Sequence, residues 1–215
     1  MFNVSLDSSP GHHMKLISVK PSPFARKARA VIIELNLQDR VEEVDVGTVT
    51  PVSNTATLNA VNPLGMIPAL ELDDGSSLNN SPLICEYLDQ AAGGQLFPAD
   101  SGPRYRTLQL QALGDGLLDV AVALRYETAL RPETLRWADW IDHQREKITR
   151  ALDALESKCA DFEPEPLIGE LTVACALGYL DFRYADDDWR PGRPGLEAWY
   201  EAISQRRSLR QTEPG

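Results

Sequence analysis

Two serine residues stand where a hydroxyl group could stabilise a bound anion. Ser22 follows a short strand-like run and precedes Pro23. Ser81 precedes Pro82 in the same way. Serine followed by proline is typical of a helix start, because serine caps free N–H groups and proline fits the first turn. A helix N-terminus has unpaired N–H donors and the positive end of the helix dipole, so it attracts anions such as a thiolate.

Ser22 is chemically suited to stabilising a thiolate. A free cysteine thiol has a pKa of about 8.5, so only a small fraction is ionised at neutral pH. Lowering that pKa by about two units requires about 2.7 kcal/mol of preference for the anion. A hydroxyl hydrogen bond to a charged group contributes about 1.5–3 kcal/mol, and a helix end contributes about 0.3–2 kcal/mol. Ser22 can therefore activate a bound thiol, although the local sequence by itself favours a plain N-cap.

The elements expected to position these serines alternate between strand and helix. Apolar residues at helical spacing follow Ser22, and a second helical pattern follows Ser81. Short or alternating apolar runs, typical of strands, precede and separate these helices, and Asp74-Gly75 indicates a hairpin turn. The expected strands cover residues 15–19, 41–46, 67–72 and 77–78, and a loop with room for a short helix covers residues 48–62. This order, β-α-β-loop-β-β-α, predicts a small α/β domain.

A change in composition marks the end of this domain. Residues 93–100 are rich in turn formers, and strand signals stop after them. The rest of the chain shows apolar stripes at helical spacing, and the apolar run over residues 173–180 predicts a buried core helix. We therefore expect an α/β domain over residues 14–93 and an all-helical domain over residues 101–215. Residues 1–13 show no periodicity and are expected to be disordered or a cloning remnant.

Three motifs carry a resemblance to a known family. They are Pro-Ser-Pro-Phe at residues 21–24, Asn-Pro-Leu-Gly-Met-Ile-Pro-Ala-Leu at residues 62–70, and Asn-Ser-Pro-Leu-Ile at residues 80–84. Their order and spacing resemble the glutathione S-transferase family, and within it the bacterial YibF-like group. The resemblance extends over nearly the whole chain from Met14. It implies that the first domain is thioredoxin-like and binds glutathione, and that the helical domain carries the acceptor-substrate cleft.

The resemblance gives Ser22 a catalytic role. Its hydroxyl would stabilise the thiolate of bound glutathione, with Phe24 contributing to the binding site. The acceptor would lie against the helices near residues 113–124. Three charged side chains are candidates for lining this cleft, although helix stabilisation explains each of them as well: Asp115, Asp119 and Arg125.

The other glutathione contacts implied by the resemblance come from two segments. A cis peptide bond before Pro68 would turn the backbone of Ile67 towards the tripeptide, which pairs with it like an added strand. Asn80 and Ser81 would hold the γ-glutamyl group at the second helix N-terminus. Many family members have an acidic residue where Asn80 stands and a lysine where Met66 stands. Each missing charge-assisted contact is worth about 1–3 kcal/mol, which is consistent with weak binding of glutathione or with a modified thiol ligand.

The helical domain departs from the family at its central buried helix. Family members commonly begin this helix with Ser or Thr, followed three residues later by Asp. Here Thr172 matches the N-cap position, and Cys175 stands where Asp would close the capping box. The apolar neighbours of Cys175 indicate a core residue and not a reactive thiol.

The net charge argues against nucleic acid as the main partner. The chain has 21 basic and 32 acidic residues, a net charge of −11 and a sequence pI near 4.7. Nucleic acid phosphates bind to clustered Lys and Arg, so this chain repels them on average. The basic pairs Arg26-Lys27 and Arg206-Arg207 are interpreted as solvated helix faces.

Composition also predicts a cytoplasmic protein without a metal site or a membrane span. No apolar run reaches the roughly 18–20 residues that a membrane helix needs, and the N-terminus lacks a signal-peptide pattern. Outside residues 1–13 the sequence has a single histidine, His143, so no metal-ligand cluster is expected. Cys85, Cys159 and Cys175 lie far apart with no CxxC pair, as is usual for reduced structural thiols.

These features support one leading function and two alternatives. The leading function is a detoxifying enzyme that uses glutathione as co-substrate and transfers its thiolate to a small electrophile. The resemblance implies a homodimer that joins the first domain of one chain to the early helices of the other. The first alternative is a non-enzymatic adaptor with the transferase fold, as in the stringent-starvation relatives, which Asn80 and Met66 favour. The second, a thiol–disulfide reductase, is weaker because Ser22 and not Cys stands at the nucleophile position.

Overall fold

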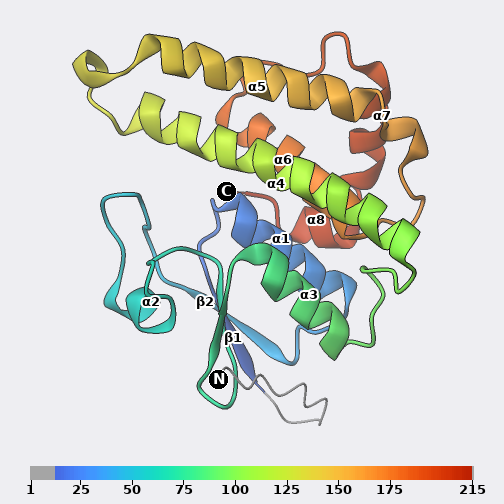
Figure 1. Ribbon diagram of the computed structural model, residues 1–215. Helices are drawn as coiled ribbons and strands as arrows, with labels where there is room; N and C mark the ends of the chain where they lie inside the picture. Colours follow the sequence, from blue (N-terminus) through green and yellow to red (C-terminus); the bar gives the residue numbers. More distant parts are fainter. Residues whose placement is uncertain (1–12, 215) are drawn as a thin grey trace. The chain divides into compact units, whose positions relative to one another are not determined.

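The computed structural model describes residues 13–214, and the chain divides into two compact units (Figure 1). The first unit runs to residue 104 and includes residues 211–214, and the second covers residues 105–210. The first is built from strands and helices, and the second from helices alone. The expected α/β plus all-helical fold is therefore confirmed. The prediction that residues 1–13 are disordered or foreign to the fold lies outside the described residues, except for His13.

A four-stranded mixed sheet forms the centre of the first unit. Its strands are β1 (Met14–Ser18), β2 (Val41–Asp45), β3 (Ala69–Glu71) and β4 (Ser77–Asn79), in the spatial order β2-β1-β3-β4. β1 and β2 are parallel, whereas β3 is antiparallel to both β1 and β4. The hairpin expected at Asp74-Gly75 joins β3 to β4, and Gly75 has a φ of +80° that suits its turn.

Helices cover both faces of this sheet. α1 (Pro23–Glu34) packs beside α3 (Ser81–Ala91), as Figure 1 shows. The short helix α2 (Ala56–Val61) lies within the loop expected between β2 and β3. Leu58 of α2 packs in one apolar cluster with Ile17 of β1 and Ala69 of β3. The sheet is thus buried between α1 and α3 on one face and α2 on the other.

The second unit is a helical bundle centred on one buried helix. Its elements are α4 (Ser101–Ala129), the 3-10 turn η1 (Glu133–Leu135), α5 (Ala138–Glu156), the 3-10 turn η2 (Cys159–Asp161), α6 (Ile168–Arg183), α7 (Pro194–Ile203) and α8 (Arg207–Gln211). Every residue from 168 to 180 is buried, which confirms the core helix predicted from the apolar run. Among residues 13–214, no helix is long and apolar enough to span a membrane.

The N-terminus of α6 corrects one prediction. The helix begins four residues before Thr172, which is therefore not its N-cap. The Thr172 hydroxyl instead donates to the carbonyl of Ile168 at 2.7 Å, within the helix. The buried carboxylate of Glu170 holds the helix start, accepting from the backbone N–H of Leu167 at 3.1 Å. Cys175 is fully buried, as expected for a core residue.

The interpretation of Arg26-Lys27 as a solvated helix face is wrong. Arg26 is 4% exposed and Lys27 is fully buried. They belong to an unbroken buried stretch of α1, residues 25–32, so this part of the helix has no solvated face. Their long aliphatic stems allow burial along an apolar surface. The second basic pair, Arg206-Arg207, is partly exposed, and Arg206 forms an ion pair with Glu165 at 3.2 Å.

Candidate functional site

Strand register brings the three predicted site segments to one edge of the sheet. Ile17, near the C-terminal end of β1, pairs with Ala69 at the start of β3. Ala69 in turn pairs with Asn79 at the end of β4. The loop that leaves β1, the segment that enters β3 and the segment that leaves β4 therefore meet at the same edge. This edge is the candidate site, and all of its predicted residues belong to the first unit.

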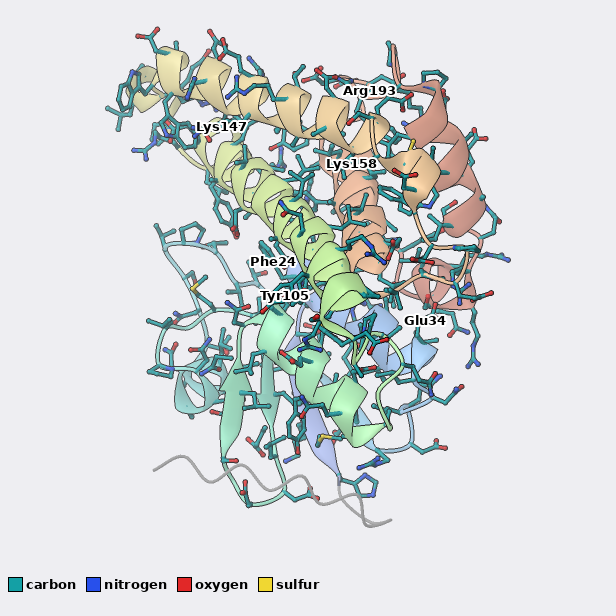
Figure 2. The ribbon with its side chains drawn as sticks, turned by 45° about the vertical axis from the view of Figure 1, so that its right-hand side comes forward. Phe24, Glu34, Tyr105, Lys147, Lys158 and Arg193 are labelled. Atoms are coloured by element: carbon teal, nitrogen blue, oxygen red, sulfur yellow. The ribbon has the colours of Figure 1, made fainter. Side chains whose placement is uncertain are left out.

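Ser22 caps α1, as the sequence predicted. Its Oγ accepts a hydrogen bond from the backbone N–H of Ala25 at 3.2 Å, and Pro23 occupies the first helical position. Because the cap uses Oγ as an acceptor, the hydroxyl proton stays available to a ligand. The side chains of Ser22 and Phe24 are half-buried. Phe24, labelled in Figure 2, lies on the first turn of α1.

The loop between β1 and α1 is held by Arg29, a residue that the sequence did not single out. Its guanidinium donates to the carbonyl of Lys20 at 3.0 Å, two residues before Ser22. Its Nε lies 3.5 Å from Oε1 of Glu43 on β2, and that same oxygen accepts from the Ser18 hydroxyl at 2.6 Å. These tertiary contacts fix the loop that carries Ser22. No local pattern signals them, because Arg29 looks like any helix residue in the sequence.

The peptide bond between Ile67 and Pro68 is cis, as expected from the resemblance. Buried Asn62, which is 2% exposed, holds the loop ahead of it. The Asn62 side chain donates to the carbonyl of Met66 at 2.7 Å and accepts from the backbone N–H of Leu64 at 3.0 Å. Asn62 belongs to the family-like motif, but no local pattern predicts that its side chain holds this loop.

Two neighbours of the cis bond complete the loop. Gly65 has a φ of +61°, a conformation that favours glycine, and a Cβ atom there would force the Asn54 side chain to move. Met66, where many relatives have lysine, is 63% exposed. Within residues 13–214, Ile67 is not part of a strand and no described backbone hydrogen bond uses its N–H or C=O. Its backbone is therefore free to pair with an extended peptide.

The start of α3 differs from the expected capping pattern. Asn80 is the N-cap residue, and Ser81 is the first helical residue instead of the cap. Asn80 has a φ of +80° and a ψ of 125°, an uncommon conformation for any residue with a Cβ. Its side chain makes no capping hydrogen bond to the described residues and is exposed. Ser81 is 3% exposed, and Pro82 at the second position is tolerated because that N–H has no partner within the helix.

The two helix N-termini at this edge remain electropositive. Within the described residues, the first turn of α1 and the first turn of α3 both lack an acidic side chain. The positive helix ends are thus not neutralised locally. A free backbone strand segment, a hydroxyl donor and two such helix ends can together bind an extended peptide that carries a carboxylate and a thiolate.

The protein's own cysteines do not supply a thiolate at this site. Cys85 and Cys175 are buried. Cys159 lies in the second unit, and its thiol donates to the carbonyl of Glu156 at 3.2 Å. Burial, and then the nearby carboxylate of Glu156, raise the pKa of the Cys159 thiol. A thiolate stabilised by Ser22 must therefore come from a ligand.

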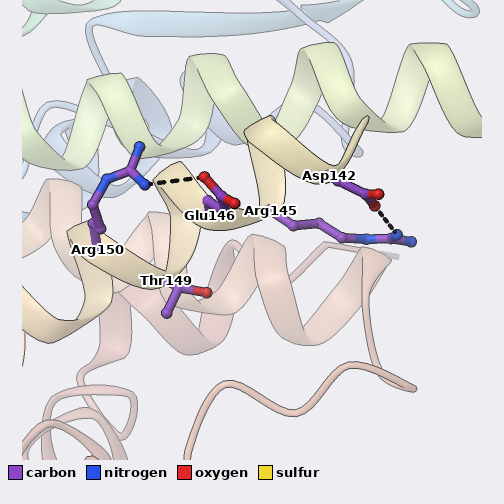
Figure 3. Close-up of a pocket in the computed structure, with 5 residues that line it drawn as sticks. All are labelled: Asp142, Arg145, Glu146, Thr149 and Arg150. Carbon is purple, nitrogen blue, oxygen red and sulfur yellow. Dashed lines mark hydrogen bonds and ion pairs between the residues drawn. The ribbon is translucent and has the colours of Figure 1, made fainter. Parts of the chain in front are cut away.

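A shallow hollow on the surface of α5 is separate from this site. Figure 3 shows its lining, which comes entirely from that one helix: Asp142, Arg145, Glu146, Thr149 and Arg150. Its charges pair with one another, with N–O distances of 3.4 Å from Arg145 to Asp142 and from Arg150 to Glu146. This is a solvated, self-paired helix face. Within residues 13–214, no group of three or more His, Cys, Asp or Glu side chains is arranged to hold a metal.

Comparison with known proteins agrees with this geometry. Residues 21–91 match the glutathione S-transferase N-terminal domain, and residues 138–202 match the C-terminal domain of the same family. The Escherichia coli K12 "Uncharacterized GST-like protein YibF" is 32% identical over 206 residues, covering 94% of this chain and 98% of that protein. The chain belongs to the glutathione S-transferase family.

Solved structures of bacterial transferases are similar over almost their whole length. A glutathione transferase family member from Pseudomonas fluorescens Pf-5 with bound glutathione is 45% identical, with a TM-score of 0.91 and coverage of 94% of this chain and 99% of that one. A second structure from Pseudomonas fluorescens Pf-5 has S-(propanoic acid)-glutathione bound. It is 43% identical, with a TM-score of 0.87 and coverage of 94% and 100%.

Proposed function

We propose that this transferase binds glutathione in its first unit and transfers the glutathione thiolate to a small electrophile. The observation that carries the proposal is the geometry of Ser22. Its Oγ is fixed by the cap bond from Ala25, which leaves its proton for a ligand at an electropositive helix end. Bound glutathione in a relative that is 45% identical supports the choice of thiol.

In this proposal Ser22 lowers the pKa of the bound thiol. A hydroxyl hydrogen bond to the thiolate is worth about 1.5–3 kcal/mol, and the end of α1 adds about 0.3–2 kcal/mol. Together they lower the thiol pKa by roughly one to four units from its usual value near 8.5. The thiol proton leaves to water, the sulfur attacks an electrophilic carbon, and a C–S bond forms as a leaving group departs or a double bond is saturated.

The rest of the peptide would be held by backbone and uncharged polar groups. The free N–H and C=O of Ile67 would pair with the cysteinyl residue of glutathione, beside cis Pro68. Asn80 and Ser81 would hold the γ-glutamyl carboxylate at the N-terminus of α3. Because Met66 and Asn80 replace charged residues of many relatives, we expect this site to bind glutathione less tightly than a site with all of those charges.

We further propose that the acceptor is a small electrophile that carries a carboxylate. A relative that is 43% identical has S-(propanoic acid)-glutathione bound. Such an adduct forms when the thiolate displaces a halide from a 3-halopropanoate or adds to the double bond of acrylate. The displacement breaks the carbon–halogen bond and releases halide, whereas the addition consumes one proton.

Glutathione affinity and conjugation assays test this function. We expect retention on immobilised glutathione, elution with free glutathione, and conjugation of 3-bromopropanoate measured by the appearance of the adduct in mass spectrometry. Retention without conjugation of any halide or activated alkene would contradict an enzymatic role. Flow-through with no thermal shift on adding glutathione would instead support the adaptor, which keeps the fold without the activity.

A further inference from the structure

A segment without charged side chains leads into the cis bond. Charged residues make up 25% of the chain, but no Asp, Glu, Lys, Arg or His occurs in residues 46–70. This segment runs from the end of β2 through α2 to the start of β3 (Figure 1). Acidic residues flank it on both sides, Asp45 on β2 and Glu71 on β3. We call residues 46–70 the charge-free segment.

Several polar side chains of the charge-free segment serve its own fold. The Thr55 hydroxyl caps α2 and accepts from the backbone N–H of Leu58 at 3.2 Å. The Asn59 amide donates to that of Asn54 at 3.0 Å. Asn62 holds the loop before the cis bond with both atoms of its amide. These hydrogen bonds shape the loop from within.

The large exposed side chains of this segment are apolar. Val52 is 90% exposed, Leu64 is 74% exposed and Met66 is 63% exposed. Leu64 and Met66 lie just before Ile67, whose backbone is free to pair with a peptide. The segment beside that backbone therefore offers dispersion contacts but no countercharge. A carboxylate placed against it loses part of its hydration without gaining an ion pair.

Strand register indicates which end of a bound tripeptide meets this apolar surface. Ala69 pairs with Asn79, and Ser81 follows two residues later, so the start of α3 lies beside the first residue of β3. In the proposed binding mode the γ-glutamyl group lies at this helix start, and the cysteinyl residue pairs with Ile67. The peptide then continues away from β3, and its glycyl carboxylate lies beside Met66 and the loop before it.

The exposed lysines of the first unit lie on other elements. Among residues 13–104 they are Lys15 and Lys20. Lys15 bonds Glu71, which lies at the opposite end of β3 from Ala69. Lys20 belongs to the loop before Ser22, which is the side of the thiol in the proposed binding mode. The arginines of this unit are either buried or bonded to α3: Arg26, Arg29, Arg40 and Arg104.

We propose that this site recognises the γ-glutamyl-cysteinyl part of its thiol ligand and not the terminal carboxylate, so that it accepts tripeptides in which that carboxylate is blocked as an amide or ester. The inference rests on the proposed function and names the class of thiol co-substrate. Met66 is the residue that determines this property, because it is the exposed side chain next to Ile67. A blocked end carries no charge, so it contacts Leu64 and Met66 at a lower desolvation cost.

The test compares two thiols that differ only in their terminal charge. One is glutathione, and the other is γ-glutamyl-cysteinyl-glycinamide, in which an amide replaces the glycyl carboxylate. Calorimetry under reducing conditions measures the Kd of each. We expect the amide to bind to the wild type within about threefold of glutathione or more tightly, because a neutral exposed surface gives the carboxylate no advantage. Added salt should favour glutathione over the amide, since it screens the flanking acids and the net charge of −11.

Met66→Lys should create the preference that the wild type lacks. We expect the lysine to tighten glutathione about 3- to 10-fold and to leave the amide unchanged, and added salt should now weaken glutathione relative to the amide. Gln38→Lys is the matched control, because Gln38 is exposed, the charge change is the same, and it precedes β2 at the opposite edge of the sheet. Leu64→Lys carries the test if Met66→Lys has a lowered melting temperature.

Lys20→Gln separates the proposal from its main competitor. We expect it to leave the ratio of the two Kd values unchanged, whereas weaker binding of glutathione alone would show that Lys20 holds the glycyl carboxylate and would overturn the inference. Wild-type binding of glutathione more than about tenfold tighter than the amide would overturn it as well. So would a Met66→Lys that affects both peptides alike. These results would leave the transferase function intact, whereas binding of neither peptide would overturn the proposed function itself.

Discussion

At the scale of single residues, one serine has two separable roles. Ser22 accepts a hydrogen bond from Ala25 as an N-cap, and its hydroxyl proton is left for a ligand. The cap role belongs to folding, because it satisfies one of the free N–H groups of α1. The donor role belongs to catalysis, because the hydrogen bond from the hydroxyl stabilises an anionic sulfur more strongly than a neutral thiol. Loss of the hydroxyl therefore affects both stability and activity, and the two effects must be measured separately.

Substitution of Ser22 by alanine should impair both roles by different amounts. The cap loss should cost about 1 kcal/mol of unfolding free energy. Loss of a hydrogen bond worth about 1.5–3 kcal/mol should raise the pKa of bound glutathione by about one to two units. Thiolate population at a pH well below the pKa then falls about 10- to 100-fold. The rate falls less, roughly 3- to 15-fold, because a more basic thiolate is a better nucleophile with a Brønsted slope near 0.4–0.5.

The measurement for Ser22 is the pH dependence of conjugation together with urea unfolding. Ser22→Thr is the control, because threonine keeps both the cap and the hydroxyl donor. Equal rates for folded Ser22→Ala and the parent between pH 6 and 8 would show that Ser22 is only a cap. Thiol activation would then depend on another group.

At the scale of elements, loops and helix crossings depend on a few close contacts. The loop before the cis bond depends on Asn62, whose side chain joins the Met66 carbonyl and the Leu64 N–H. The crossing of α4 and α6 depends on two glycines. A Cβ on Gly169 would lie 2.7 Å from the carbonyl oxygen of Thr107, and a Cβ on Gly114 would lie 2.9 Å from Cγ2 of Thr172.

Asn62→Ala should loosen the loop that presents Ile67. Removing both side-chain hydrogen bonds leaves the Met66 carbonyl and the Leu64 N–H without this partner, so we expect a loss of about 1–3 kcal/mol of unfolding free energy. Glutathione should bind more weakly, whereas the pKa of the bound thiol should stay near its parent value. The matched control is Asn59→Ala, which removes an exposed side-chain bond to Asn54 and should change stability by less than about 0.5 kcal/mol. Urea unfolding and glutathione titration measure both effects, and equal stability losses in the two variants would refute this role.

Two glycines on α4 should respond to alanine in opposite directions. Gly114→Ala places a methyl group against Thr172 and 3.2 Å from the backbone N of Val173, so we expect destabilisation of about 1–3 kcal/mol. At Gly116 a Cβ would meet no described atom within 4 Å outside its own helix, so alanine should stabilise by up to about 1 kcal/mol. Thermal or urea unfolding of both variants measures the difference. The same sign of change in both would contradict the close crossing.

The sequence predicted features that depend on neighbouring residues and missed those that depend on distant ones. The succession of strands and helices along the first domain, the cap at Ser22 and the buried helix follow from local patterns, and the cis bond follows from the family motif. Arg29 was missed because its partners, Lys20 and Glu43, are brought to it only by the folded sheet. The family pattern predicts Thr172 as the cap of this helix, whereas α6 begins at Ile168 and the Glu170 carboxylate accepts from the N–H of Leu167.

At the scale of the whole molecule, surface composition bears on assembly. The chain has a net charge of −11, which favours solubility and opposes association at low ionic strength. Large apolar side chains are also exposed in both units. In the first unit these are Val52, Leu64, Met66 and Leu83, and in the second they are Tyr105, Leu130, Leu135 and Trp137. In a two-fold dimer, the apolar set on the first unit of each chain would contact the apolar set on the second unit of the other chain.

We therefore predict a homodimer that joins the first unit of one chain to the start of α4 in the other. Leu83 on α3 is 49% exposed and Tyr105 on α4 is 71% exposed. A carboxylate buried against an apolar partner is strongly unfavourable, so Leu83→Glu and Tyr105→Glu should each shift the protein to monomers. Trp137→Glu is the control, because Trp137 is similarly exposed but begins α5, outside the expected interface. Light scattering at micromolar concentration measures the mass, and added salt should tighten the dimer by screening its charge. A parent protein of monomer mass would refute the dimer. A monomeric Trp137→Glu together with a dimeric Leu83→Glu would refute the proposed interface and place it near Trp137.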